Sequence, residues 1–322
     1  MIYVDDRRAG NHGIARFARE VLARLSDRVP DLVRLPVRGS ATTPPDCVRP
    51  GRLRPTSRDV ILSPGPNAGI SRAVQLVTLH DLIHLQSGSR LRSLYYQRVL
   101  RPTILRAGRV LTVSDASREA IEDWLGAQAT SVDVEVVGNG CSSAFTPEGD
   151  AEAFDRPTLT MVSNAKPHKN VEVVFRALAR CGDLGMVVVG PSPEAMSALA
   201  ARADVADRVE VRRDVSDAEL ARLYRGSAAL LMPSIREGFG LPVLEAMSCG
   251  TRPVHWAGCG PVAEIADGSG IAVADATDDG EWAEAMEKVA IAGPLRLPDA
   301  WAHRYDWDRV GERVARVLRE LA

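Results

Sequence analysis

Two glutamates, Glu237 and Glu245, lie in a stretch that is otherwise rich in glycine and apolar residues, REGFGLPVLEAMSCG (236–250). A carboxylate that is buried without a partner costs several kcal/mol or takes up a proton. The two side chains therefore either reach water or are kept for a ligand. As surface acids near a helix start they would gain only about 0.3 to 1 kcal/mol from the helix dipole.

The elements around this stretch place the two acids at different depths. The apolar run AALLMPS (228–234) predicts a buried strand, Pro242 suits the first turn of a helix, and Gly250 suits its C-terminal cap. Glu237 is then expected in the loop after the strand, and Glu245 about one turn into the helix.

A ligand that carries both hydroxyls and phosphates would use such a site fully. Gly238 and Gly240 let the backbone approach a ligand closely, and the amides at a helix start favour anions. Carboxylates accept hydrogen bonds from paired hydroxyls, so two acids this far apart predict two diols. One diol would lie on a sugar ring and the other on a ribose.

The order of predicted strands and helices indicates an α/β protein with two domains. At 322 residues the chain exceeds a usual single core, and the strand–helix alternation restarts after a linker near residues 143–156. We expect two Rossmann-like domains, 1–148 and 156–303, that face a central cleft with ligands at the carboxyl ends of the strands. The last segment, 304–322, predicts an amphipathic helix that packs back toward the N-terminal domain.

Composition excludes several classes of protein. The chain is 45% hydrophobic and 25% charged, with a net charge of −2, which gives no strong basic excess for nucleic acid. No apolar run approaches about 18 residues and no signal peptide is visible, so we expect a cytoplasmic protein. No CxxC pairing occurs, and we expect reduced thiols without a metal role at all five cysteines: Cys47, Cys141, Cys181, Cys249 and Cys259.

A basic segment lies in the first half of the chain. The span from Leu82 to Ser114 contains no acid and six arginines: Arg90, Arg92, Arg98, Arg101, Arg106 and Arg109. A solvated helix face is the interpretation we favour. The alternative is a peripheral contact of the Arg90–Arg109 region with the inner face of a membrane, or with an anionic acceptor.

The extended segment REGFGLPVLEAMSCGTRPV closely resembles the Glu-x7-Glu motif of the family-four retaining glycosyltransferases of group 1, which have the two-domain GT-B fold. The match spans nearly the whole chain. The resemblance implies that Glu245 holds ribose hydroxyls and that Glu237 holds sugar hydroxyls and is catalytic. It also assigns the donor site to the residues that follow Glu237: Gly238, Phe239, Gly240 and Leu241.

The segment SNAKPHKN (163–170) resembles the basic motif of this family, in which a lysine holds the donor diphosphate. Lys169 matches that lysine and is the expected catalytic phosphate ligand. Many members have a Gly-Arg pair where this chain has Ser163 and Asn164. The second basic contact is then expected from Lys166 or His168, with Asn164 and Lys166 both assigned to donor binding.

Two segments of the first domain carry the rest of the resemblance. TLHDLIHL (78–85) resembles the His-Asp segment, which places His80 near the donor sugar and the acceptor as a third catalytic residue. By itself His80 would be interpreted as a satisfied core or surface histidine. DDRRAGNHGIARF (5–17) resembles the glycine-rich first loop, in which Gly13 opens a helix toward the phosphates.

The resemblance implies transfer of a hexosyl group from a nucleoside diphosphate sugar to an acceptor, with retention at the anomeric carbon. The donor is a co-substrate, and neither a cofactor nor a metal ion is expected, because positive groups replace the ion. The acceptor is a glycan, a lipid-linked molecule or a small metabolite. The arginine-rich, lysine-poor composition is typical of a GC-rich bacterial genome.

Two alternatives keep the fold and change the function. A nucleotide-sugar epimerase or hydrolase would use the same donor without an acceptor, but the Glu-x7-Glu and Lys-Asn segments argue against it. An inactive nucleotide-sugar-binding protein is supported only by the departures at Ser163 and Asn164. A dehydrogenase is disfavoured, since no G-x-G-x-x-G follows the first strand.

Overall fold

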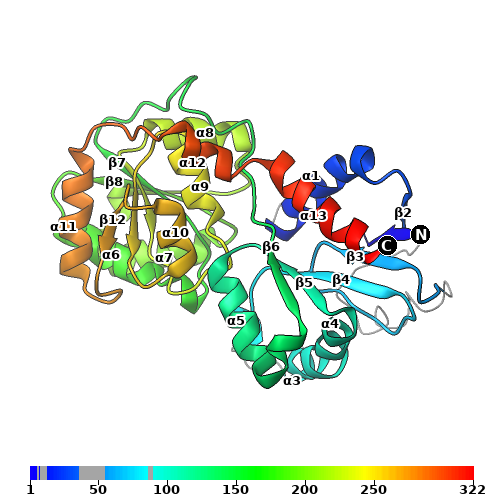
Figure 1. Cartoon of the computed structure of the whole chain (residues 1–322). Coiled ribbons are helices and arrows are strands. Elements are labelled where there is room, and N and C mark those ends of the chain that lie inside the picture. The colour runs from blue at the N-terminus through cyan, green and yellow to red at the C-terminus, as the bar shows by residue number, and fades with distance from the viewer. Residues whose placement is uncertain (6, 8–12, 36–54, 86–89) are drawn as a thin grey trace. The chain divides into compact units, whose positions relative to one another are not determined.

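The chain divides into two units that each contain one six-stranded parallel sheet (Figure 1). The computed structural model describes residues 1–5, 7, 13–35, 55–85 and 90–322. Unit 1 comprises Met1–Gly140 and Arg304–Ala322, and unit 2 comprises Cys141–His303. The first unit thus ends before the expected boundary at residue 148, and the C-terminal segment is part of it. Cys47 and residues 8–12 of the segment that resembles the glycine-rich motif lie outside the described ranges.

The sheet of unit 1 has the order β2-β1-β3-β4-β5-β6, with all described pairs parallel. Its strands are β1 (Ile2–Val4), β2 (Leu32–Arg34), β3 (Val60–Ser63), β4 (Val74–Leu79), β5 (Arg109–Thr112) and β6 (Asp133–Val136). Its helical elements are α1 (Gly13–Arg28), η2 (Ile83–Leu85), α3 (Arg90–Tyr95), η3 (Tyr96–Leu100), α4 (Arg101–Ala107), α5 (Asp115–Leu125), η4 (Gly126–Ser131) and α13 (Trp307–Leu321). The strand order reverses between β1 and β3, which is where ligands bind in sheets of this kind.

Helix α13 lies along α1, so the two ends of the chain belong to the same unit (Figure 1). Asp306 caps α13, because its side chain accepts a hydrogen bond from the Asp308 amide at 2.7 Å. The expected apolar stripe of this helix is buried at Val310, Val314, Val317 and Leu318. Charged contacts add to this packing, as Arg24 of α1 pairs with Asp308 at 3.0 Å.

The sheet of unit 2 has the order β12-β11-β10-β7-β8-β9, again with parallel pairs. Its strands are β7 (Thr158–Val162), β8 (Gly185–Val189), β9 (Val209–Arg212), β10 (Ala229–Met232), β11 (Pro253–Trp256) and β12 (Ile271–Val273). Its helical elements are η5 (Pro167–Lys169), α6 (Val171–Arg180), α7 (Pro193–Arg202), η6 (Ala206–Arg208), α8 (Asp217–Gly226), α9 (Leu241–Ser248), α10 (Gly260–Ala266), α11 (Asp279–Ala290) and α12 (Asp299–Arg304).

Counted from β7, this order is the Rossmann order 3-2-1-4-5-6 reversed, and β7 and β10 flank the point where it changes direction. Helices cover both faces of the sheet: α6 packs with α7 and α11, and α9 packs with α8 and α10 (Figure 1). This cover explains why the inner strands β8 and β10 are wholly apolar, with the sequences GMVVV and ALLM. Each unit therefore has its own core and its own point of strand reversal.

A close backbone contact fixes the carboxyl edge of the unit 2 sheet. Gly190 follows β8, and a Cβ atom at this position would lie 1.9 Å from the carbonyl oxygen of Ser163, which follows β7. The contacted atom belongs to the backbone, which cannot move aside as the end of a flexible side chain can. The glycine therefore lets the two strand ends, and the loop that begins at Ser163, lie close together.

Replacing this glycine should destabilise the protein severely. We expect Gly190→Ala to lose more than about 3 kcal/mol of unfolding free energy or to yield no folded protein, because the two strand ends must separate. Gly182→Ala is the matched control, since nothing lies within 4 Å of the added Cβ atom. Urea unfolding followed by circular dichroism measures both variants, and a wild-type midpoint for Gly190→Ala would contradict the prediction.

Candidate functional site

The basic loop and the Glu-x7-Glu stretch meet at the strand reversal of unit 2. Lys169 ends η5 in the loop after β7, and Glu237 lies in the loop after β10, the strand hydrogen-bonded to β7. The Ile235 amide donates to the His168 carbonyl at 2.8 Å and ties the two loops together. Adjacent parallel strands thus bring residues from distant parts of the sequence to one sheet edge.

Lys169 and Glu237 form an ion pair at this edge. The Lys169 Nζ donates to Glu237 Oε1 at 2.6 Å, and the two side chains are only 18% and 13% exposed. Cys259 lies close to both charges, and burial, followed by the negative charge of Glu237, raises the pKa of its thiol to about 12. The pair therefore holds one positive and one negative group at the strand ends, largely withdrawn from water.

Helix α9 begins directly after this pair. Gly240 is its N-cap with φ 109°, and a Cβ atom there would lie 3.1 Å from Val262 of α10. A residue with a side chain would be strained in this conformation as well as crowded. Gly238, Phe239 and Leu241 are half-buried around the helix start. The positive end of the α9 dipole consequently lies close in sequence to Glu237.

Glu245 lies about one turn into α9, as expected, and is 6% exposed. The hydroxyl of Tyr224, from α8, donates to Glu245 Oε2 at 3.4 Å. Tyr224 was not identified from the sequence, although a tyrosine on the apolar stripe of a helix needs a partner for its hydroxyl. The need of a buried tyrosine hydroxyl for a hydrogen-bond partner was the feature of the sequence that could have identified Tyr224.

Asn164 and Lys166 occupy the turn before Lys169. The Asn164 Oδ1 accepts a hydrogen bond from the Lys166 amide at 3.2 Å, and Lys166 is exposed. Asn164 therefore helps to shape the loop. Of the two loop lysines, Lys169 is the one that has a described contact with Glu237.

Unit 1 holds the other two predicted residues. His80 follows β4, is 8% exposed, and its Nε2 lies 2.9 Å from the Pro64 carbonyl oxygen in the loop after β3. Its ring packs edge-to-face on Phe17 of α1, with 4.9 Å between ring centroids. Gly13 begins the same helix one turn earlier. Helix α1 thus connects the helix start at Gly13 with the histidine at the sheet edge.

A buried ion pair that was not expected from the sequence follows the first strand of unit 1. Arg7 donates through Nε and Nη2 to the two carboxylate oxygens of Asp5, at 2.7 and 2.6 Å, and the two side chains are about 5% exposed. The bidentate geometry is the strong form of this contact. Consecutive charges in DDRR gave no indication that these two would be buried.

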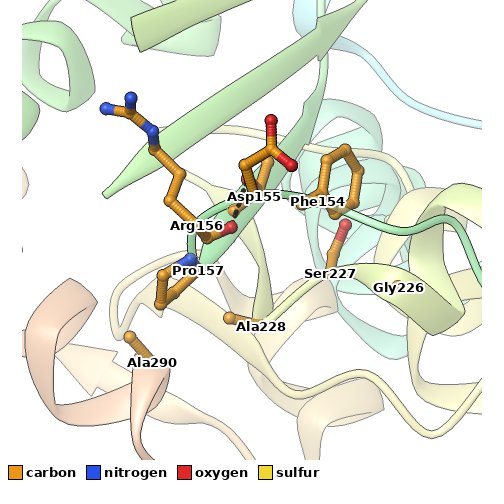
Figure 2. A pocket seen from close by; sticks show the side chains of 9 residues that line it. Phe154, Asp155, Arg156, Pro157, Gly226, Ser227, Ala228 and Ala290 are labelled. Carbon is orange, nitrogen blue, oxygen red and sulfur yellow. Dashed lines mark hydrogen bonds between the residues drawn. The ribbon is translucent and has the colours of Figure 1, made fainter. Parts of the chain in front are cut away.

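A cavity of about 410 Å³ lies elsewhere in unit 2. Its wall includes Pro157, just before β7, and Ser227 and Ala228, just before β10 (Figure 2). It is therefore at the amino ends of the same two strands whose carboxyl ends carry Lys169 and Glu237. The cavity is therefore not lined by Lys169, Glu237 or Glu245, the site residues predicted for this unit.

Acidic and other metal-ligating side chains do not gather into a metal centre in the described ranges. No group of three or more His, Cys, Asp or Glu side chains is arranged there to hold a metal ion. The segment DATDDG (275–280) forms a turn in which Asp275 accepts from the amide and hydroxyl of Thr277, and Asp278 caps α11.

Comparison with known proteins assigns the segment that contains this site to a family. Residues 146–298 match the family described as glycosyl transferases group 1. A D-inositol 3-phosphate glycosyltransferase of Mycolicibacterium smegmatis is 29% identical over 237 residues, which are 64% of this chain and 54% of that protein. An O-antigen chain mannosyltransferase of Salmonella typhimurium is 27% identical over 76% of this chain and 69% of its own length. The chain spans about half the length of the first of these relatives.

Solved structures share the fold at low sequence identity. An Anabaena protein crystallised with UDP and glucose superposes with a TM-score of 0.73 at 16% identity, covering 99% of both chains. The structural neighbours include a glycosyltransferase of lipopolysaccharide biosynthesis and one from Rickettsia africae, and the two-unit α/β architecture is the GT-B fold. Identity this low supports the fold alone.

The Lys169–Glu237 pair should be energetically coupled. Lys169→Met leaves a mostly buried carboxylate without its cation, and we expect a loss of about 1 to 3 kcal/mol of unfolding free energy. The double variant Lys169→Met, Glu237→Gln should recover most of that loss. Urea unfolding of the four proteins measures the coupling as a double-mutant cycle.

An exposed ion pair of the same unit provides the control. Arg202 and Glu172 are 70% and 63% exposed at 3.5 Å, so Arg202→Met should change stability by less than about 1 kcal/mol. Additive effects of the Lys169 and Glu237 substitutions would show that the two side chains are not coupled.

Proposed function

We propose that this chain, whose residues 146–298 match the group 1 glycosyl transferases, transfers a sugar from a nucleoside diphosphate sugar to an acceptor hydroxyl with retention at the anomeric carbon. The observation that carries the proposal is the meeting of Lys169 and Glu237 at the strand reversal of that segment. Ligands of doubly wound sheets bind at this position. The half-buried lysine is suited to an anion, and the neighbouring carboxylate to hydroxyl groups.

Three residues of unit 2 divide the donor between them in this proposal. Lys169 and the start of α9 bind the diphosphate, Glu237 accepts hydrogen bonds from sugar hydroxyls, and Glu245 accepts them from ribose hydroxyls. The depth of Glu245 in α9 and its low exposure support a contact with a part of the donor that is enclosed by protein. His80 of unit 1 is proposed to act near the donor sugar and the acceptor.

The reaction we propose proceeds on one face of the sugar. The bond between the anomeric carbon and the phosphate oxygen breaks as the acceptor oxygen forms its new bond. The acceptor proton passes to the departing phosphate, which serves as the base. Lys169 and the helix amides stabilise the charge that develops on the diphosphate, and loss of one such group commonly costs about 10² to 10³ in rate. No covalent nucleophile is assigned.

The finer features of the activity are part of the same proposal. We propose a hexosyl donor and no requirement for a metal ion, because Lys169 supplies the positive charge at the phosphates. The proposed acceptor is a glycan, a lipid-linked molecule or a small metabolite. The names of the relatives, an inositol phosphate glycosyltransferase and an O-antigen mannosyltransferase, support acceptors rich in hydroxyl groups.

We also propose a peripheral contact of the protein with the anionic cytoplasmic face of a membrane. The part of the protein that makes this contact is smaller than the whole Arg90–Arg109 region. Arg101 contacts the Leu125 carbonyl, Arg106 the Ala73 carbonyl and Arg109 the Asp133 carboxylate, so these three side chains are held against unit 1. The proposed surface is formed by exposed arginines of α3 and η3: Arg90, Arg92 and Arg98. None of the helices that the structure describes has the length and apolar character needed to span a bilayer.

Exposed aliphatic side chains accompany these arginines. Leu91 and Leu94 of α3 are 81% and 53% exposed, and Tyr95 ties the neighbouring loop to this helix through the Ala68 amide at 2.7 Å. Ile70 of that loop is 70% exposed. Apolar side chains beside cations suit the boundary between lipid headgroups and acyl chains.

Nucleotide binding tests the proposed donor. We expect one of UDP, GDP, dTDP and ADP to raise the melting temperature of the wild type with or without EDTA. At about 100 times the dissociation constant the gain is about 2.7 kcal/mol, or a few degrees. Glu245→Ala should lose the shift, whereas Glu284→Ala, an exposed glutamate of the same unit, should retain it.

The outcome also separates the alternatives. No shift with any nucleotide, or a shift only when a divalent ion is present, would contradict the proposed donor site. Once a donor is known, proton NMR of the product gives the anomeric configuration, and inversion would overturn the proposed course of the reaction. Donor hydrolysis or epimerisation that does not depend on an acceptor would assign the chain to the other enzyme class.

Vesicle flotation tests the membrane surface. We expect the wild type to float with vesicles that contain anionic phosphatidylglycerol, and to be released by high salt, since each arginine near the surface contributes about 1 kcal/mol. Leu91→Ser, Leu94→Ser should reduce flotation. Ile291→Ser is the control because Ile291 is 89% exposed in unit 2. Equal flotation of both variants would exclude α3 from the contact.

A further inference from the structure

Tyr224 is a fully buried tyrosine whose hydroxyl faces the carboxylate of Glu245. The residue is 0% exposed on α8, and its hydroxyl donates to Glu245 Oε2 at 3.4 Å. Helix α8 packs against α9, which carries Glu245. The contact therefore joins two helices inside unit 2, and one of its partners is the glutamate assigned to the ribose.

The position of Tyr224 is fixed from several sides. The ring of Phe145 lies against its ring, with 6.0 Å between centroids at an angle of 53°. The hydroxyl of Thr251, just after α9, donates to the Tyr224 backbone carbonyl at 2.5 Å. The backbone and the ring of Tyr224 are thus held by separate contacts. These contacts place the Tyr224 hydroxyl next to Glu245 even without the hydrogen bond between the two side chains.

A carboxylate at this depth needs a donor that orients it. A buried acceptor without hydrogen bonds is costly, and a charged one more so. The donor at Oε2 restricts rotation of the carboxylate and so fixes the direction in which its oxygens face. Burial, followed by the negative charge of Glu245, raises the pKa of Tyr224 well above its usual value, so the hydroxyl keeps its proton.

We propose that Tyr224 is a positioning residue, which orients the Glu245 carboxylate toward the ribose hydroxyls of the donor nucleotide. The inference rests on the proposed function, in which Glu245 contacts the ribose. Tyr224 itself touches no part of the donor and acts through Glu245. Its contribution should therefore appear as selectivity for ribose over 2′-deoxyribose.

The experiment compares Tyr224→Phe with the wild type on paired nucleotides. Isothermal titration measures the dissociation constants of UDP, GDP and ADP, and of the 2′-deoxy form of each. We expect the wild type to prefer a ribose nucleotide about tenfold or more, because a hydrogen bond to a charged group is lost in the deoxy form. Tyr224→Phe should reduce this preference by about 3- to 10-fold by weakening the ribose form.

The kinetic signature should match the binding. For a donor sugar that is turned over, Tyr224→Phe should raise KM by about the same factor and leave kcat within about twofold. Tyr96→Phe is the matched control, since Tyr96 is 2% exposed in unit 1, and it should alter neither the preference nor KM. Urea unfolding of each variant records any loss of stability separately.

The outcomes distinguish this inference from the proposed function. Failure of the wild type to bind UDP, GDP, ADP or dTDP would overturn the donor assignment, and the inference with it. Binding of dTDP alone would overturn the ribose contact of Glu245 and the inference, but not the donor site. Binding without a preference for ribose would overturn the role of Glu245. A wild type that prefers ribose, together with Tyr224→Phe that keeps the full preference, would leave the donor site intact and overturn the positioning role alone.

Discussion

The pairing of β7 with β10 is the constraint on which the candidate site depends. These strands are adjacent in the sheet, yet the chain forms β8 and β9 on one side before it returns to make β10 on the other. The loops at their carboxyl ends are therefore brought together from positions 68 residues apart. Helix cover on both faces leaves this edge of the sheet as the place where charged loop residues can gather.

Both units keep an ion pair in a similar position. Asp5 and Arg7 follow the first strand of unit 1, and Lys169 follows the first strand of unit 2 and pairs with Glu237. The side chains of both pairs are at most 18% exposed, and removing such charges from water is expensive. A protein that needed only stability could use apolar residues here, so the retained charges are more readily explained by chemistry at the strand ends.

Periodicity and short motifs in the sequence predicted the local features of the fold. Helix α9, the depth of Glu245 within it, and the cap and apolar face of α13 can all be inferred from spacing and cap residues. Contacts between distant residues could not be inferred, because periodicity says which face is buried but not what lies against it. The Lys169–Glu237 pair, the Tyr224 hydroxyl, and the backbone contacts of Arg101 and Arg106 belong to this class.

The Lys169–Glu237 pair also makes the two halves of donor recognition interdependent. Under the proposed function, a diphosphate that binds Lys169 draws it away from a carboxylate that is 13% exposed. A complete nucleotide sugar compensates for this loss, because its hydroxyls donate to Glu237 as the phosphates engage the lysine. The nucleoside diphosphate product supplies no such hydroxyls and leaves Glu237 less well satisfied. The same contact that stabilises the ligand-free site therefore favours the intact donor over the product that must depart.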